Sequence, residues 1–136
     1  MYRILKEFHF SASHQLKQLP DEHPCGRLHG HNYVVEVALA AEALNGVGFV
    51  RDYRELSPFK DWLDRTLDHR HLNDVLGDEC VTAEHIAKTC FDWCKARWPE
   101  TEAVRISETP KTWAEYRPER ALGNTPPAEA LPDNGS

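Results

Sequence analysis

Alternating apolar and polar residues predict two long strands in the first third of the chain. Residues 2–12 place apolar side chains at every second position, except at Lys6, and residues 29–41 do the same. Residues 15–28 between them contain prolines and glycines and are predicted to form a loop. The residues that share a face are Tyr2, Ile4, Phe8, Phe10 and Ala12 in the first strand and His31, Tyr33, Val35, Val37 and Leu39 in the second.

Helical spacing follows in the middle of the chain. It predicts one helix over residues 54–67, with Pro58 near its first turn, and another over residues 83–97. Thr82 is the expected N-cap of the second helix. The apolar stripes are Leu56, Phe59, Leu63 and Leu67 in the first helix and Ala83, Ile86, Ala87, Cys90 and Cys94 in the second.

Three shorter strands complete the pattern. A short strand is expected at "GFVRDY", residues 48–53, and two more over residues 102–108 and 112–117. The resulting order predicts an α+β domain, in which an antiparallel sheet carries two helices on one face.

The length of 136 residues fits one domain, which we place at residues 1–117. Residues 118–136 hold four prolines and almost no large apolar side chains, so we expect a disordered tail there.

The net charge of −6 argues against a partner that is duplex nucleic acid. No apolar run is long enough for a membrane span and no signal-peptide pattern opens the chain, so a cytoplasmic location with free cysteine thiols is expected.

A metal site is the chemistry best supported by spacing. His29 and His31 are two residues apart on a predicted strand, so their rings project from one face. His14 leaves the first strand on its apolar face and would converge with them if the strands pair. Three protein ligands with one open position are typical of catalytic zinc. The histidines His9, His23, His71 and His85 receive no role.

Cys25 allows two interpretations. As a fourth ligand it would close a structural zinc site and remove the open position. Alternatively, it is a reagent whose proton is handled by Asp68 and His69, an arrangement of the usual nucleophile, base and carboxylate type. An Asp-His pair after a helix is also a common surface cap, and spacing leaves both interpretations of Cys25 open.

Five motifs occur in order between residues 8 and 109: "FSASH", "CGRLHGHNY", "LDHRHLN", "TAEHIA" and "SET". Together they resemble the 6-pyruvoyl-tetrahydropterin synthase superfamily. Within it, "CGRLHGH" is most similar to the bacterial 6-carboxytetrahydropterin synthase branch of the queuosine pathway. Each motif alone is weak, whereas the ordered set is specific.

The resemblance implies a role for most of the candidate residues. It implies that zinc binds His14, His29 and His31, that Cys25, Asp68 and His69 form a proton-transfer triad, and that Glu108 anchors the pterin ring. Thr82 matches the entrance of the second helix and is a weaker substrate-binding candidate; Asp52 matches a recurring aspartate without an assigned role. From charge alone, Arg27 or Arg70 is a candidate for contacting the triphosphate.

The resemblance also implies a reaction and an assembly. The reaction is a lyase step on 7,8-dihydroneopterin triphosphate that releases triphosphate and acetaldehyde and leaves a 6-carboxylate. The fold is the tunnelling fold, or T-fold, assembled as a homohexamer of two trimers with sites between subunits. Two alternatives stay open: the sister reaction, which keeps the side chain as a pyruvoyl group, and a non-enzymatic structural zinc module.

Overall fold

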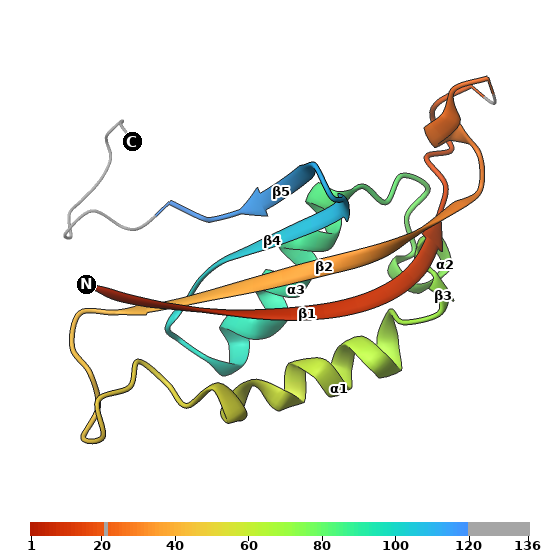
Figure 1. The fold of residues 1–136 in the computed structure, drawn as a ribbon. Helices are drawn as coiled ribbons and strands as arrows, with labels where there is room; N and C mark the ends of the chain where they lie inside the picture. The colour runs from red at the N-terminus through yellow and green to blue at the C-terminus, as the bar shows by residue number, and fades with distance from the viewer. Residues whose placement is uncertain (21, 120–136) are drawn as a thin grey trace.

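The computed structural model describes residues 1–20 and 22–119 as one five-stranded sheet with helices against it (Figure 1). Strands β1 (Tyr2–His14) and β2 (His29–Ala41) pair antiparallel along their whole length, from Tyr2 opposite Ala41 to His14 opposite His29. Strand β4 (Thr101–Thr109) pairs with β2, and β5 (Thr112–Tyr116) with β4. Strand β3 (Arg70–His71) adds to β1 at the other edge, giving the order β3-β1-β2-β4-β5.

Among the described residues, three α-helices and two short 3-10 helices complete the fold. Helices α1 (Ser57–Thr66) and α3 (Ala83–Arg97) contribute their apolar stripes to the core. The short helix α2 (Leu72–Leu76) lies between them in sequence and next to β3 in Figure 1. The 3-10 helices are η1 (Pro24–Gly26) and η2 (Tyr53–Leu56). No helix in the described ranges is long and apolar enough to cross a membrane.

The predicted N-cap of the second helix is confirmed. The Thr82 hydroxyl accepts a hydrogen bond from the His85 backbone N–H at 3.2 Å, and the His85 ring accepts one from the Thr82 N–H at 3.4 Å. This reciprocal pair satisfies two of the donors that a helix start leaves without partners. Helix α3 therefore begins and ends at the predicted residues.

The core lies between one face of the sheet and the helices. The strand residues that the alternation assigned to one face are mostly buried, with Lys6 and Tyr2 exposed towards the open end of β1. The fully buried side chains at the centre are Tyr33, Val35, Leu39, Leu56, Phe59, Leu63, Leu67, Leu72, Ile86, Ala87, Cys90, Cys94, Val104 and Ile106. Burial raises the pKa of the Cys90 and Cys94 thiols, so these cysteines are inert packing residues.

Four predictions need correction. The sheet is mixed, because β3 runs parallel to β1, and α2 adds a third helix. Residues 48–53 form no strand, and the first helix begins at Ser57, after η2. The Asp52 side chain accepts the Arg54 N–H and so starts η2, whose four residues precede the α-helix. The predicted tail, apart from residues 118 and 119, lies outside the described residues.

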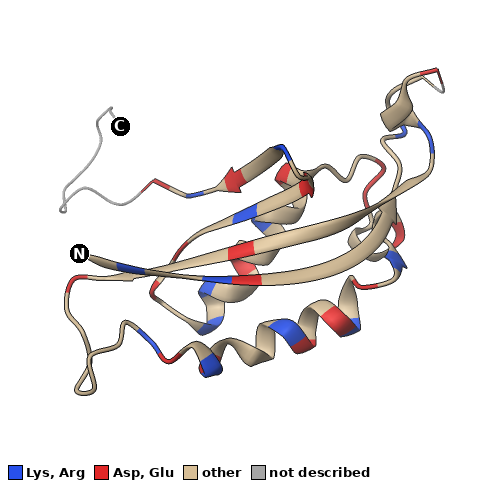
Figure 2. Cartoon of the chain, in the orientation of Figure 1, with Lys and Arg blue, Asp and Glu red and all other residues tan. Residues whose placement is uncertain are grey.

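Charges of both signs alternate over the strands and helices, without a face of one sign in this view (Figure 2). Several form pairs, such as Lys60 with Asp64 and Lys88 with Asp92 one helical turn apart. Pairs of this kind on an exposed surface contribute little stability each.

Candidate functional site

Three imidazoles meet at the end of the β1–β2 ladder. His14 is paired directly with His29, and His31 lies opposite Ala12 in the next pair but one along the strands. One ring nitrogen from each of the three histidines lies within 4.8 Å of the others. The ring centroids are 4.4 Å apart for His14 and His29, 4.9 Å for His29 and His31, and 5.1 Å for His14 and His31.

Backbone carbonyls set the tautomer of two of the rings. The Nδ1 atom of His14 lies 2.6 Å from the Val81 carbonyl oxygen, and that of His29 lies 2.6 Å from the Arg27 carbonyl oxygen. Because a carbonyl only accepts, both Nδ1 atoms carry the proton and both Nε2 atoms keep a free lone pair. This is the arrangement that orients histidines as metal ligands.

Burial also favours the neutral form of the His14 and His31 rings. The His14 ring is 2 % exposed, and desolvation is the main reason that its pKa lies below the ordinary value. Burial likewise lowers the pKa of His31, against the opposing effect of the Glu108 charge. His14 Nε2 is buried with no hydrogen-bond partner among the described residues. A metal ion bound by the three Nε2 atoms would remove that cost, so the residues present fit a metal.

Glu108 reaches the same point from β4. Its Oε2 atom lies 3.5 Å from His14 Nε2 and 3.9 Å from His31 Nε2, and its side chain is 25 % exposed. The Tyr33 ring packs against the rings of His14 and His31. Burial and the Glu108 charge raise the pKa of its hydroxyl. The carboxylate is therefore next to the histidine cluster and still open to a ligand.

Cys25 lies outside the histidine cluster, which contains no thiol within the described ranges. It belongs to η1, and its backbone N–H is accepted by the His23 ring. Two contacts tie this loop to the end of β1: the Leu16 N–H donates to the Cys25 carbonyl and the Gln15 side chain donates to the Gly26 carbonyl, both at 3.0 Å. These contacts hold the loop, with its half-buried thiol, against the residues that directly follow His14, and the thiol is not part of the cluster.

Asp68 and His69 form a hydrogen-bonded pair at the edge of the sheet. The His69 Nδ1 atom lies 2.8 Å from an Asp68 carboxylate oxygen, and the Ser11 N–H donates to the other oxygen at 2.9 Å. The Ser11 bond is the largest cause, and His69 the next, of an Asp68 pKa below its usual range. His69 has φ 58° and a side chain that is 82 % exposed. Such a backbone conformation is uncommon outside glycine and often marks a functional position.

No hydrogen bond joins Cys25 to His69 in the part of the chain that the structure describes. The fold thus builds the Asp68–His69 pair but leaves its ring directed to solvent. Thr82 serves as a helix cap, and Asp52 binds Arg54 at 2.7 Å, away from the cluster. The exposed Arg70 lines a polar hollow at the β1–β3 edge.

Two supporting residues escaped the sequence prediction. Buried Asn73 bonds to both the N–H and the carbonyl of Gln15, at 2.8 and 2.7 Å, and so holds the chain immediately after His14. Ser11 anchors Asp68 through its backbone alone. The Asn73 partner lies 58 residues away in sequence, and a backbone donor leaves no side-chain signal, so neither contact could be inferred from spacing.

Comparison with known proteins agrees with the motif pattern. A family model described as 6-pyruvoyl tetrahydropterin synthase matches residues 3–119. The 6-carboxy-5,6,7,8-tetrahydropterin synthase of Synechocystis sp. is 38 % identical over 122 residues, which cover 85 % of this chain and 93 % of that protein. The Bacillus subtilis protein with the same name is 30 % identical, over 88 % of this chain and 87 % of its own.

Solved structures show the same fold. The 6-pyruvoyl tetrahydropterin synthase of Caenorhabditis elegans superimposes with a TM-score of 0.76 at 28 % identity, over 87 % of this chain and 96 % of that chain. The predicted tunnelling fold is therefore confirmed, with the mixed sheet described above.

Proposed function

The chain belongs to the 6-pyruvoyl tetrahydropterin synthase family, and on that premise we propose that it is a zinc-dependent 6-carboxy-5,6,7,8-tetrahydropterin synthase. The observation that carries the proposal is the cluster of three imidazoles, two of them fixed by backbone carbonyls, beside an open carboxylate. Two curated relatives with this name cover most of the chain at 30 % identity or more.

The proposed substrates are 7,8-dihydroneopterin triphosphate and one water molecule, and the products are 6-carboxy-5,6,7,8-tetrahydropterin, acetaldehyde and triphosphate, within queuosine biosynthesis. His14, His29 and His31 would hold the zinc ion. When bound there, zinc supplies Lewis acidity that makes the substrate hydroxyls more acidic. The pathway and a cytoplasmic location stay predictions.

The side chains around the cluster supply the remaining chemistry. Glu108 accepts hydrogen bonds from the N–H and amino groups of the pterin, in the way a carboxylate accepts from a guanidinium. Cys25 removes a carbon-bound proton of the substrate. His69 donates and accepts protons on the opposite side of the substrate. Asp68 holds His69 through the 2.8 Å hydrogen bond and is kept ionised by the Ser11 N–H.

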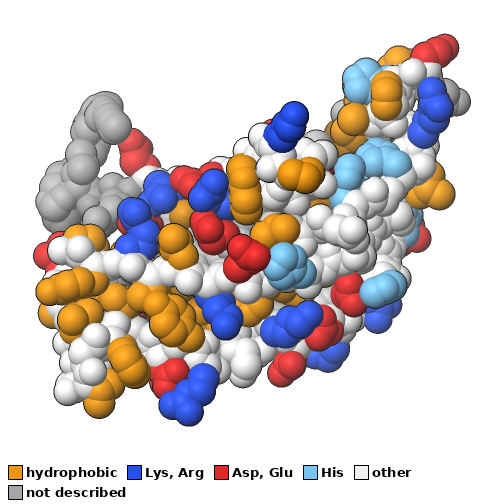
Figure 3. All heavy atoms as spheres, viewed as in Figure 1, with side chains coloured by type: hydrophobic (Ala, Val, Ile, Leu, Met, Phe, Trp, Pro, Cys, Tyr) orange, Lys and Arg blue, Asp and Glu red, His pale blue; other side chains and the backbone are white. Residues whose placement is uncertain are grey.

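We further propose that the active form is a homohexamer of two trimers with sites between subunits. Within the described residues, β1 pairs with another strand on its outer edge only at Ala12 and Ser13, and the groups next to this short pairing bind Asp68, His69 and Lys60. Residues 2–8 have no strand partner on that side. Apolar side chains gather at this end of the sheet, whereas histidines gather at the other (Figure 3). The exposed apolar residues include Met1, Tyr2, Leu5, Val47, Phe49 and Tyr53.

An interface would also complete the triad. His69 is exposed and, within the described residues, makes no hydrogen bond with Cys25 of its own chain, so a neighbouring copy is the natural source of its thiol partner. Arg27 and Arg70, both exposed, remain candidates for the triphosphate.

Product analysis tests the proposed reaction. Purified protein is incubated with 7,8-dihydroneopterin triphosphate, and the pterin product is identified by mass spectrometry while acetaldehyde is measured in parallel. The proposal predicts a 6-carboxylate and stoichiometric acetaldehyde.

A pyruvoyl product without acetaldehyde would assign the chain to the sister reaction, which is the activity named for the C. elegans neighbour. Absence of any turnover, with metal bound, would instead favour the structural zinc module. The exclusion of Cys25 from the histidine cluster already counts against that alternative.

A further inference from the structure

Tyr33 carries a buried hydroxyl that no group in the described ranges satisfies. Its ring is fully buried and stacks on Phe10 of the neighbouring strand, with ring centroids 4.8 Å apart. Phenylalanine would fill the same space without burying a donor, and an unpaired buried donor costs folding free energy. Core packing therefore explains the ring of Tyr33 but not its hydroxyl.

The position of Tyr33 links the hydroxyl to the candidate site. Its ring centroid lies 5.5 Å from that of His31 and 6.1 Å from that of His14. On the other side of β2, the register pairs Val34 with Ser107. Continuing that antiparallel register by one residue places Glu108 opposite Tyr33 on the same face of the sheet.

Glu108 has two possible tasks at this point. Its Oε2 atom is 3.5 Å from His14 Nε2 and 3.9 Å from His31 Nε2, so a small movement would let the carboxylate join the metal ligands. The proposed function needs the same carboxylate for the pterin. A donor that binds one carboxylate oxygen would hold the group away from the metal, while the remaining lone pairs of both oxygens stay available for the ring.

We propose that Tyr33 is this donor, a positioning residue that hydrogen-bonds Glu108 when a pterin is bound. The inference rests on the proposed function, because it concerns how Glu108 recognises the pterin. It adds a specificity residue outside the metal ligands and the Cys25–Asp68–His69 triad. The unpaired hydroxyl lowers the stability of the pterin-free protein. Its hydrogen bond to Glu108 strengthens pterin binding.

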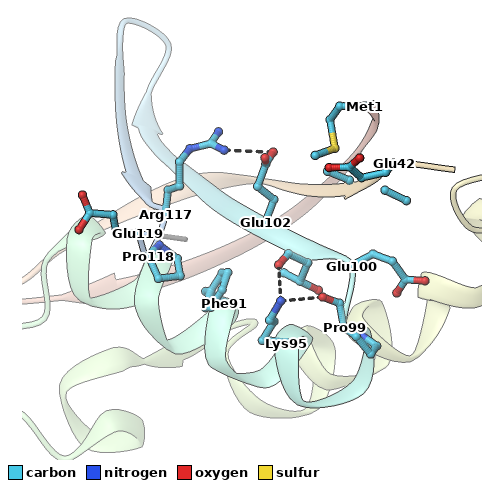
Figure 4. Close-up of a pocket in the computed structure, with 13 residues that line it drawn as sticks. Met1, Glu42, Phe91, Lys95, Pro99, Glu100, Glu102, Arg117, Pro118 and Glu119 are labelled. Atoms are coloured by element: carbon cyan, nitrogen blue, oxygen red, sulfur yellow. Dashed lines mark hydrogen bonds and ion pairs between the residues drawn. The ribbon is translucent and has the colours of Figure 1, made fainter. Parts of the chain in front are cut away.

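A hollow at the opposite end of the molecule shows the contrast (Figure 4). Several of its charged groups already have partners: Glu102 pairs with Arg3 and Arg117, and the Lys95 ammonium donates to the Pro99 and Thr101 carbonyls. Satisfied groups of this kind call for no ligand. The buried side-chain atoms that lack a hydrogen-bond partner in the described ranges, His14 Nε2 and the Tyr33 hydroxyl, lie instead at the histidine end.

The first test is Tyr33→Phe in the metal-loaded protein, with neopterin as a fluorescent probe of pterin binding. We expect the dissociation constant for neopterin to rise about tenfold, as for loss of a hydrogen bond to a charged group. Metal content should be unchanged and Tm equal or higher. Tyr116→Phe, on β5 and half-buried, is the matched control and should leave neopterin binding unchanged.

Unchanged neopterin binding in Tyr33→Phe would overturn the inference, since the hydroxyl would be idle. A fall in Tm together with affinity would also overturn it, because the hydroxyl would then have a structural partner.

A double-mutant cycle with Glu108→Gln shows whether Tyr33 acts through Glu108. We expect the double variant to bind neopterin no more weakly than Glu108→Gln alone. An equal further loss in the double variant would mean that Tyr33 acts independently, against the inference. If Glu108→Gln alone leaves neopterin binding intact, the pterin-anchor role of Glu108 fails as well, an outcome distinct from failure of Tyr33 alone.

Discussion

At the scale of single residues, two backbone carbonyls decide what the histidines can do. Because Val81 and Arg27 accept the Nδ1 protons, the Nε2 lone pairs of His14 and His29 are available in the neutral rings. The same rings without these carbonyls could rotate or exchange tautomers, and each metal contact would then carry an ordering cost. The site is thus prepared for a cation before one arrives.

The lowered pKa values of His14 and His31 predict how stability changes with pH. Because both folded-state pKa values lie below the ordinary 6.5, the unfolded chain takes up protons first as the pH falls. The stability that these rings provide in their neutral form is complete above about pH 6.5 and decreases below it, down to the folded pKa values. Urea unfolding of the metal-free protein between pH 7.5 and 5 measures this.

His14→Asn is the comparison for that experiment, because it removes the most buried of the three rings. Its stability should depend less on pH over the same range. An equal or steeper dependence in the variant would show that other groups are responsible.

Sequence spacing could predict the histidine cluster because alternation along β1 and β2 is a local property. His14, His29 and His31 share the parity of Phe10 and Tyr33, so pairing of the two strands brings them together. The Val81 carbonyl could not be foreseen, since it lies 67 residues from His14 and reaches it only through the loop before α3. Local pattern places the ligands, whereas tertiary contacts orient them.

At the scale of elements, the loop between β1 and β2 determines the position of Cys25. The loop turns back so that Gln15 and Leu16, directly after His14, bind the carbonyls of Gly26 and Cys25. Gly26 is buried against the Pro20 and Leu19 carbonyls. A β-carbon at this position would overlap the Pro20 carbonyl oxygen and lie only 2.9 Å from the Leu19 carbonyl oxygen, so both contacts would be steric clashes. Glycine at this position therefore allows the close approach that fixes the thiol.

Gly26→Ala should lower turnover strongly, because the backbone on either side of the new methyl group must shift and carry Cys25 with it. Overpacking of this kind costs about 1–3 kcal/mol of stability. Gly46→Ala is the matched control, because a β-carbon there meets nothing within 4 Å. Urea unfolding and steady-state rates of both variants are the measurements; full activity in Gly26→Ala would mean that the loop does not position the thiol.

The elements that sequence analysis missed are those without a periodic signal. Strand β3 has two residues and α2 five, too short for either period to show. The expected strand at residues 48–53 fails because Asn45 satisfies the backbone locally: its side-chain oxygen accepts the N–H groups of Val47 and Phe49 at 3.0 Å. The long strands and α3 have strong periodic patterns, and their predicted bounds agree closely with the structure.

At the scale of the whole molecule, one chain places its reactive groups in two locations. Cys25 lies in the loop that is tied to the residues after His14, whereas the Asp68–His69 pair points outwards from the β3 edge. Assembly would join these locations if the pair of one copy faces the thiol of the next. The free edge of β1 and its exposed apolar neighbours provide the surface for such contact.

Subunit complementation tests this arrangement. Cys25→Ala and His69→Ala should each be inactive, and mixed hexamers formed by dissociating and reassembling the two should regain part of the activity. Recovery is expected because some sites would combine an intact Cys25 with an intact His69 from a neighbouring chain. Light scattering checks that both variants and the mixture have the hexamer mass; a mixture that forms hexamers and stays inactive would show that the triad belongs to one chain.

The metal content of Cys25→Ala tests the central claim most directly, that three histidines hold the metal while the cysteine handles protons. Elemental analysis of the purified variant should find as much zinc as in the unchanged protein, about one ion per chain, while the same sample forms no product. Loss of zinc from Cys25→Ala would contradict the account, because the thiol would then be a ligand and the site a closed one.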